Sequence, residues 1–285
     1  MELADYLRSK HSEKSVRRYL HDIKQYQTYN ANHETAIHKD IMDYIGSLRR
    51  TEITSQTILT TLYSIRKYYD YLMKSGQRED HPCRFIKLRD GRQKDIQLQD
   101  LFTTAELEKL LDRKERYPRN KLKNQIIISL LIYQALSNGG ITRIELSDVN
   151  LEAAEIYIRQ SSTLNERTLK LRSNQIMMLY KYIHEVRLNL IKEETDILIL
   201  TMRGTAEKGE GIHYLTETLR KKYPSRKLNP TTIRQSVITN LLKEGKDLRI
   251  VQAFAGHKHP STTEKYKQTD VEELKIEVLK YHPLG

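Results

Sequence analysis

Residues 228–270 read LNPTTIRQSVITNLLKEGKDLRIVQAFAGHKHPSTTEKYKQTD. Apolar residues at helical spacing predict one helix over residues 231–245 and a second over residues 247–256. The Pro-Ser-Thr-Thr segment that follows predicts a turn before Tyr266. The chain holds 18 tyrosines and 10 histidines, so the pair His257 and Tyr266 indicates a functional site only together with its neighbours.

The N-terminal third of the chain and the segment after residue 100 also have helical patterns. Within residues 1–88, apolar side chains recur every three or four positions in three successive segments. Ser12 can cap the first of these helices, and Gly76 is well placed to end the third. Residues 124–136, NQIIISLLIYQAL, are too apolar for a surface helix, so we expect a central core helix there.

The pattern changes from helical to alternating between residues 155 and 172, where apolar and polar side chains alternate around a Ser-Thr-Leu-Asn segment. Such alternation predicts a β-hairpin, and the fold class is therefore mainly α with a small β-sheet. A polar, mixed-charge segment at residues 91–100 is expected to link an N-terminal helical domain, residues 1–90, to a second domain, residues 101–285. A length of 285 residues suits two modest domains.

The charge of the chain favours a polyanionic partner. The formal net charge is +12. Residues 1–90 carry 16 Lys and Arg against 12 Asp and Glu, and the remaining residues carry 33 against 25. The excess is thus shared by both predicted domains, which is typical of a protein that contacts a long track of phosphates with both of them.

Several other classes of protein are excluded or disfavoured by composition. No apolar run approaches the ~18 residues that a membrane span needs, and the N-terminus lacks the pattern of a signal peptide. We therefore expect a cytoplasmic protein with no membrane partner. The single cysteine, Cys83, excludes an internal disulfide and a cysteine-cluster metal site. No cofactor and no metal are expected.

The motif around Tyr266 extends over about 45 residues and resembles the C-terminal half of the tyrosine recombinases, the phage-type integrases. The elements that carry the resemblance stand at the family's spacing; they are Arg234, GKDLRIVQ at 245–252, Gly256-His257, STT at 261–263 and Tyr266. Residues 57–83 resemble the last helix of the family's N-terminal DNA-binding domain. Residues 101–111 and 130–152 resemble the start and the first arginine segment of its catalytic domain.

The resemblance implies a reaction, and three of the family's site residues are present in this sequence. A tyrosine hydroxyl attacks a DNA phosphodiester, the phosphate becomes linked to the tyrosine, and a free 5′-hydroxyl of another strand reverses the step. Tyr266 matches the nucleophile, Arg234 the second arginine, and His257 the histidine that follows the glycine. The resemblance further implies double-stranded DNA with a short inverted-repeat core site as partner, and a homo-oligomer, dimer to tetramer, on that DNA.

Three other positions of the family's site carry small hydroxyl side chains here. The segment SDVNL sets the alignment, and Ser137 then falls where the family has its first arginine. Ser162 occupies the position of the lysine on the hairpin, and Thr231 that of the first residue of His-x-x-Arg. An alternative alignment on Arg143 would need the spacing to SDVNL to be shorter by six residues.

Another cation could replace the missing charges. Arg159, Arg167 and Lys170 lie on the predicted hairpin. We expect Arg159 to be the best candidate, because it directly precedes the turn that holds Ser162. Two interpretations remain open: an active recombinase with a divergent site, or a weak or inactive relative that binds DNA as an accessory or regulatory protein. Retention of Tyr266 favours activity.

The C-terminal segment, residues 271–285, carries a further apolar pattern. Its apolar positions recur at helical spacing; they are Val271, Leu274, Val278 and Leu279. The resemblance implies that this segment docks on a neighbouring subunit of the DNA-bound assembly.

Overall fold

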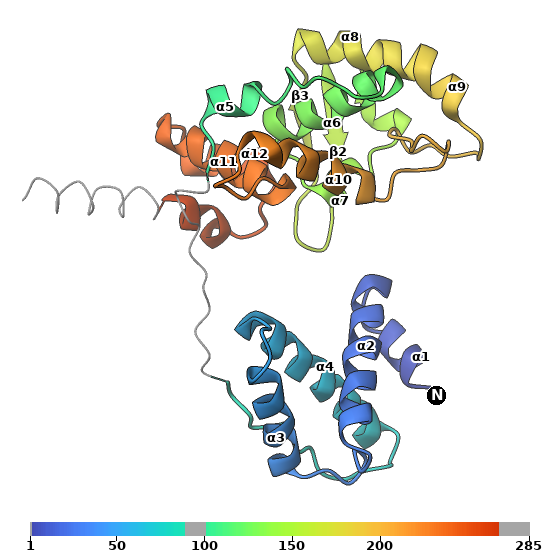
Figure 1. Ribbon diagram of the computed structural model, residues 1–285, viewed down its shortest axis with the longest axis vertical. Coiled ribbons are helices and arrows are strands. Elements are labelled where there is room, and N and C mark those ends of the chain that lie inside the picture. The colour runs from blue at the N-terminus through green and yellow to red at the C-terminus, as the bar shows by residue number, and fades with distance from the viewer. Residues whose placement is uncertain (1, 89–100, 268–285) are drawn as a thin grey trace, which may run out of the picture. The chain divides into compact units, whose positions relative to one another are not determined.

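The computed structural model describes residues 2–88 and 101–267. The chain divides into two compact units, Met1–Lys94 and Asp95–Gly285 (Figure 1). The segment predicted to link the two domains and the C-terminal segment 271–285 lie outside the described residues. No helix in the described ranges combines the length and the apolarity needed to cross a membrane.

The N-terminal unit is a bundle of helices. Its helices are α1 Leu3–Arg8, α2 Glu13–Tyr29, α3 His38–Arg49 and α4 Ser55–Lys74. Helix α2 packs against α4 (Figure 1), and its apolar residues Val16, Ile23 and Tyr26 are buried. Gly76 follows α4 with a φ of +72°, so its predicted role in ending that helix is confirmed.

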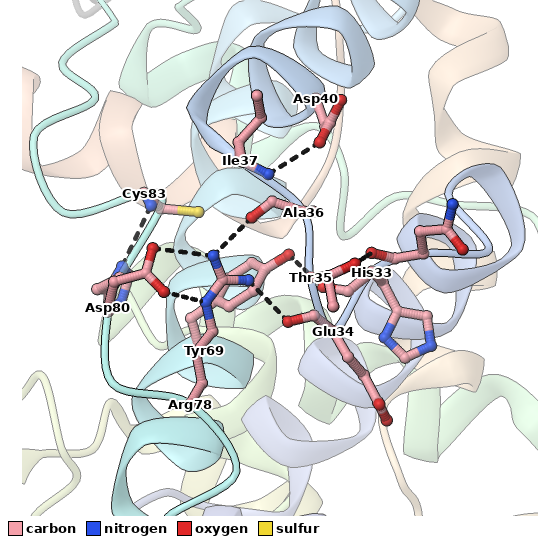
Figure 2. Close-up of polar contacts among 12 residues, drawn as sticks. His33, Glu34, Thr35, Ala36, Ile37, Asp40, Tyr69, Arg78, Asp80 and Cys83 are labelled. Atoms are coloured by element: carbon pink, nitrogen blue, oxygen red, sulfur yellow. Dashed lines mark hydrogen bonds and ion pairs between the residues drawn. The ribbon is translucent and has the colours of Figure 1, made fainter.

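Buried hydroxyls and one arginine fix the connection between α2 and α3. The hydroxyls of Tyr26 and Tyr69 lie 2.7 Å apart, and Tyr69 donates to the carbonyl of His33 at 2.7 Å. Arg78 donates to the carbonyls of Glu34 and Ala36 at 2.8 and 2.7 Å, as Figure 2 shows. Each buried polar group in this region therefore has a partner, which ties the connecting segment to the end of α4.

The second unit is organised around one buried helix. Its helices include α5 Thr104–Glu108, α6 Lys121–Tyr133, α7 Asn138–Ile141, α8 Ser173–Lys181, α9 Leu188–Leu190, α10 Glu210–Leu219, α11 Pro230–Lys243 and α12 Leu248–Ala255, with a π-helical turn Tyr182–Arg187 between α8 and α9. Every residue from Ile126 to Ile132 is buried, so the prediction of a central core helix is confirmed (Figure 1).

A three-stranded antiparallel sheet lies in this unit, with strand order β1-β2-β3. The strands are β1 Val149–Asn150, β2 Glu155–Ile158 and β3 Arg167–Lys170. Strands β2 and β3 form the predicted hairpin, in which Ile156 pairs with Leu169. Strand β1 was not predicted, because two residues are too few to show an alternating pattern. The predicted class, mainly α with a small sheet, is confirmed.

The segment before Tyr266 differs from the sequence prediction. The predicted turn Pro-Ser-Thr-Thr is instead the beginning of a helix, which runs over residues 260–267. Proline suits the first position of a helix, where its fixed φ is favourable and its missing N–H costs nothing. Tyr266 therefore projects from a helix that starts only three residues after His257.

Candidate active site

A cleft of about 900 Å³ opens on the second unit. Segments far apart in sequence line it: the residues after α6, the loop between β2 and β3, the start of α11 and the residues after α12. Five of the six positions singled out in the sequence lie on this cleft: Ser137, Ser162, Thr231, Arg234 and His257. The sixth, Tyr266, stacks on His257, with ring centroids 6.0 Å apart and an angle of 10° between the planes.

The described lining of the cleft is basic and contains no carboxylate. Besides Arg234 and His257, it includes Lys227, Lys258, His213 and His259. A concave surface with cations and no acidic residue attracts a polyanion and raises its local concentration. The cleft is therefore suited to a phosphate backbone.

Arg234 lies on α11 and is held in one orientation by backbone carbonyls. It is 8% exposed. Its Nη1 donates to the carbonyl of Ala135 at 2.5 Å, and its Nη2 donates to that of Ala255 at 2.6 Å. Burial lowers the pKa of Arg234, although a guanidinium keeps its charge in proteins. The two carbonyls thus hold the guanidinium of Arg234 in place, and it presents a fixed positive charge at the cleft.

His257 is fixed by its own segment and kept neutral. Its Nδ1 lies 2.9 Å from the hydroxyl of Thr263, and its backbone carbonyl accepts from Gln252 at 3.1 Å. Burial, and then the charges of Arg234 and Arg167, lower the pKa of His257 to about 4. At neutral pH the ring is therefore an uncharged imidazole beside Tyr266, with one nitrogen able to donate and one able to accept.

Tyr266 is partly buried against the end of the helical core. Its ring packs on the cluster of Ile238, Val251 and Ala255. Burial raises the pKa of the Tyr266 phenol, and the nearby charge of Arg234 opposes this rise. The phenol is protonated at neutral pH, so it must lose its proton as it attacks.

Ser137, Ser162 and Thr231 line the cleft but supply no charge. The hydroxyl of Ser137 accepts from the backbone N–H of Gly140 at 3.1 Å and caps α7. Ser162 is exposed in the loop between β2 and β3, and Thr231 is exposed in the first turn of α11. Arg143 does not line the cleft; its Nε donates to the carbonyl of Gly139 at 2.8 Å.

Arg159 does not reach the cleft, which corrects the expectation that it is the compensating cation. Its Nε lies 3.0 Å from a carboxylate oxygen of Asp148, and its two Nη atoms lie 2.8 and 2.5 Å from the carboxylate oxygens of Glu145. Two carboxylates therefore neutralise it. Strand alternation explains the placement, because Arg159 follows the buried Ile158 and so belongs to the opposite face.

Arg167 is the hairpin cation on the inner face of the sheet. It lies two residues before the buried Leu169 in β3, so the two side chains share the inner face of the strand. Lys170 points to the outer face and pairs with Glu155 at 2.8 Å. The alternation of β3 was the signal that could have selected Arg167.

The neutral state of His257 predicts a pH-dependent contribution to stability. Its folded pKa of about 4 lies below the ordinary histidine value of 6.5, so the unfolded chain binds the proton more readily. The contribution is complete above pH 6.5 and is lost as the pH falls towards 4. We expect the free energy of unfolding in urea to fall between pH 7.5 and 5 by about 2 kcal/mol more in the wild type than in His257→Gln. Equal losses in the two proteins would contradict this assignment.

Comparison with known proteins places the whole chain in one family. Residues 100–273 match the phage integrase family, and residues 2–76 match the phage integrase N-terminal SAM-like domain. The chain is 28% identical over 280 residues to the tyrosine recombinase XerD of Staphylococcus haemolyticus, covering 95% of this chain and 93% of the relative. It is 26% identical over 282 residues to the tyrosine recombinase XerC of Anoxybacillus flavithermus, covering 96% and 93%.

Solved structures share the same fold. The XerH site-specific recombinase bound to its difH substrate, in a pre-cleavage complex, superposes with a TM-score of 0.68 at 20% identity, covering 85% of this chain and 70% of that one. The Tn1549 transposon integrase in complex with transposon right end DNA superposes with a TM-score of 0.67 at 15% identity, covering 96% and 100%. The resemblance seen in the motif around Tyr266 is thereby confirmed, and the chain belongs to the phage integrase family, the tyrosine recombinases.

Proposed function

We propose that this protein is a site-specific DNA recombinase that cuts and rejoins strands through a 3′-phosphotyrosine intermediate. The observation that carries the proposal is the convergence of Arg234, His257 and Tyr266 at one cleft whose described lining contains no carboxylate. The tyrosine recombinases XerD and XerC align with more than nine-tenths of this chain. The partner is double-stranded DNA with a short inverted-repeat core site.

The proposed reaction is a pair of phosphoryl transfers that retain bond energy. The oxygen of Tyr266 forms a bond to the scissile phosphorus as the bond from phosphorus to the 5′-oxygen breaks. The phenol loses a proton, and the leaving oxygen gains one to become a free 5′-hydroxyl. A 5′-hydroxyl of a second strand then attacks the phosphotyrosine and releases Tyr266. The chemistry needs no ATP, because each step exchanges one phosphoester for another.

Arg234 and His257 have separate roles in this proposal. Negative charge grows on the non-bridging oxygens during phosphoryl transfer, and the fixed guanidinium of Arg234 stabilises it. His257 is neutral, so it donates a hydrogen bond to the phosphate from one ring nitrogen while Thr263 orients the other. Both groups are positioned before the substrate arrives, so little reorganisation is needed during the reaction.

A covalent adduct on a nicked core site tests this function. The core site is first selected by the protein from a random-sequence duplex pool. A nick beside the scissile phosphate lets the short 5′-hydroxyl fragment diffuse away, which traps the phosphotyrosine. We expect a protein–DNA band that survives denaturing electrophoresis. Absence of the band on a bound, assembled site would support the accessory DNA-binding role instead.

We propose that a groove on the second unit is the acceptor surface of the oligomer. A groove of about 440 Å³ is lined mostly by apolar side chains, among them Leu107, Ile132, Val237 and Phe254. Ile250, also in its lining, is 63% exposed. We propose that the apolar stripe of residues 271–285 from a neighbouring subunit docks in this groove on DNA. An exposed apolar groove of this kind suits an amphipathic helix.

Removal of residues 271–285 should abolish cooperative assembly and spare the binding of one subunit to one half-site. The apolar stripe would no longer cover the neighbour's groove, while the cleft stays intact. The measurement is a gel shift on duplexes with one or two half-sites. Ile250→Lys, which changes the acceptor side, should give the same loss. Unchanged cooperativity in both variants would exclude this assembly.

A further inference from the structure

One guanidinium lies beside the candidate active site without lining the cleft. Arg167 begins β3, opposite Ile158 in β2. Its Nη1 donates to the carbonyl of Asn165 at 3.3 Å. Its Nε is buried and has no hydrogen-bond partner among the described residues. A buried N–H of a charged group without an acceptor is costly and calls for an explanation.

Arg167 packs directly on the backbone that carries His257. A Cβ added at Gly256 would collide with Nη1 of Arg167 and lie 2.9 Å from its Cζ. Glycine is also required there because its φ is +71°. The backbone N–H of Asn165 donates to the carbonyl of Gly256 at 2.8 Å, and Leu164 forms an isolated bridge with His257. Arg167 therefore supports the junction between the hairpin loop and the Gly256–His257 segment.

The charge of Arg167 is not neutralised by the protein. No carboxylate in the described ranges lies within ion-pair distance of it, whereas Arg159 on the neighbouring strand contacts two. Burial, and then the nearby Arg234, lower the pKa of Arg167 to about 10. Arg167 is partly buried, and its Nε has no partner among the described residues. Such a cation next to a second cation raises the free energy of the empty site. A bound anion relieves this cost, so the arrangement favours a phosphate in the cleft.

A purely structural role explains this arrangement poorly. Buried charges can often be replaced by apolar side chains of similar volume with no loss of stability, or with a gain. An uncharged side chain would fill the space next to Gly256 without an unpartnered Nε. The charge of Arg167 destabilises the protein without substrate. Such a cost is expected where the charge serves substrate binding or the reaction.

We propose that Arg167 is a positioning residue that supplies the second positive charge of the active site, which the serines at 137 and 162 do not provide. The inference rests on the proposed function. Arg167 acts through the Gly256–His257 segment in two ways. Its positive charge stabilises the negative phosphate on the other side of this backbone segment. Its side chain also holds His257 in place. Charges act strongly over such a distance in a low-dielectric, water-poor region.

The variant Arg167→Met removes the charge and keeps an apolar stem of similar length. We expect its adduct rate on the nicked core site, at saturating protein, to fall by ~10²-fold or more. Its thermal midpoint should be equal to that of the wild type or higher, because an unpaired buried charge is removed. Lys170→Met removes one charge from the outer face of the same strand and should leave the adduct rate unchanged.

A neutral substrate separates charge from packing. In a methylphosphonate, a methyl group replaces one non-bridging oxygen, so the scissile group carries no charge. If Arg167 acts through its charge, the defect of Arg167→Met should shrink at least tenfold on a nicked site with a methylphosphonate at the scissile position. An equal defect of Arg167→Met on both substrates would mean that Arg167 contributes only packing. A rate of Arg167→Met equal to that of the wild type on the phosphate substrate would also overturn the inference. A wild type that forms no adduct would instead contradict the proposed function itself.

A second variant keeps the test open if Arg167→Met does not fold or bind. A lysine at this position lies near Arg234 of α11 and His257, and burial beside another cation lowers its pKa. The adduct rate of Arg167→Lys relative to the wild type should therefore fall as the pH rises from 7 to 9 on the phosphate, and should stay level on the methylphosphonate. A ratio that does not change with pH on either substrate would overturn the inference.

Discussion

Arg234→Ala should lower the rate of covalent adduct formation by ~10³–10⁵-fold, which is the rate enhancement that an arginine finger gives to phosphoryl transfer. This corresponds to roughly 4–7 kcal/mol of barrier. Arg234 provides the one guanidinium in the described lining of the cleft, and the carbonyls of Ala135 and Ala255 fix its orientation. Ser137 and Ser162 cannot take over its charge. The measurement is a single-turnover rate on the nicked core site at saturating protein.

Two control variants make the result for Arg234 specific. Arg234→Lys keeps a charge but cannot bridge two carbonyls and a phosphate, so it should remain strongly impaired. Arg143→Ala removes an exposed arginine whose Nε donates to the carbonyl of Gly139, and its rate should stay within about threefold of the wild type, as for an isolated surface charge. A small effect of Arg234→Ala would show that another group carries the phosphate.

Tyr266→Phe should eliminate the adduct completely and preserve DNA binding. The substitution removes only the hydroxyl that attacks phosphorus. The ring keeps its stacking on His257 and its packing on Ile238 and Val251, so the half-site affinity should not change. The measurements are denaturing electrophoresis for the adduct and a gel shift for binding. Tyr214→Phe, at a side chain that is 70% exposed, serves as the matched control.

The outcome for Tyr266→Phe also decides between nucleophiles. An adduct that persists in the variant would mean that another side chain attacks the phosphate, and the assignment of Tyr266 would be wrong. An adduct that is present in the wild type and absent in the variant would identify the hydroxyl of Tyr266 as the nucleophile and leave no place for the inactive, accessory interpretation.

The sequence by itself determined the local elements and the residue types of the site. Helical periodicity located the three long helices of the N-terminal unit, and the mostly apolar segment 124–136 located the core helix. The resemblance to the tyrosine recombinases selected Arg234, His257 and Tyr266, which the structure brings together. Local patterns succeed here because the burial of one face repeats with the period of the element itself.

Only the tertiary structure showed how the environments of the two hairpin arginines differ. Arg159 and Arg167 belong to one hairpin, but Arg159 meets the carboxylates of Asp148 and Glu145, whereas Arg167 packs on Gly256. These contacts join positions far apart in the chain, as does the hydrogen bond from Arg234 to Ala135. Local sequence patterns report which face of an element is buried. They do not report which distant backbone group that face will meet, because that depends on how the elements pack against one another.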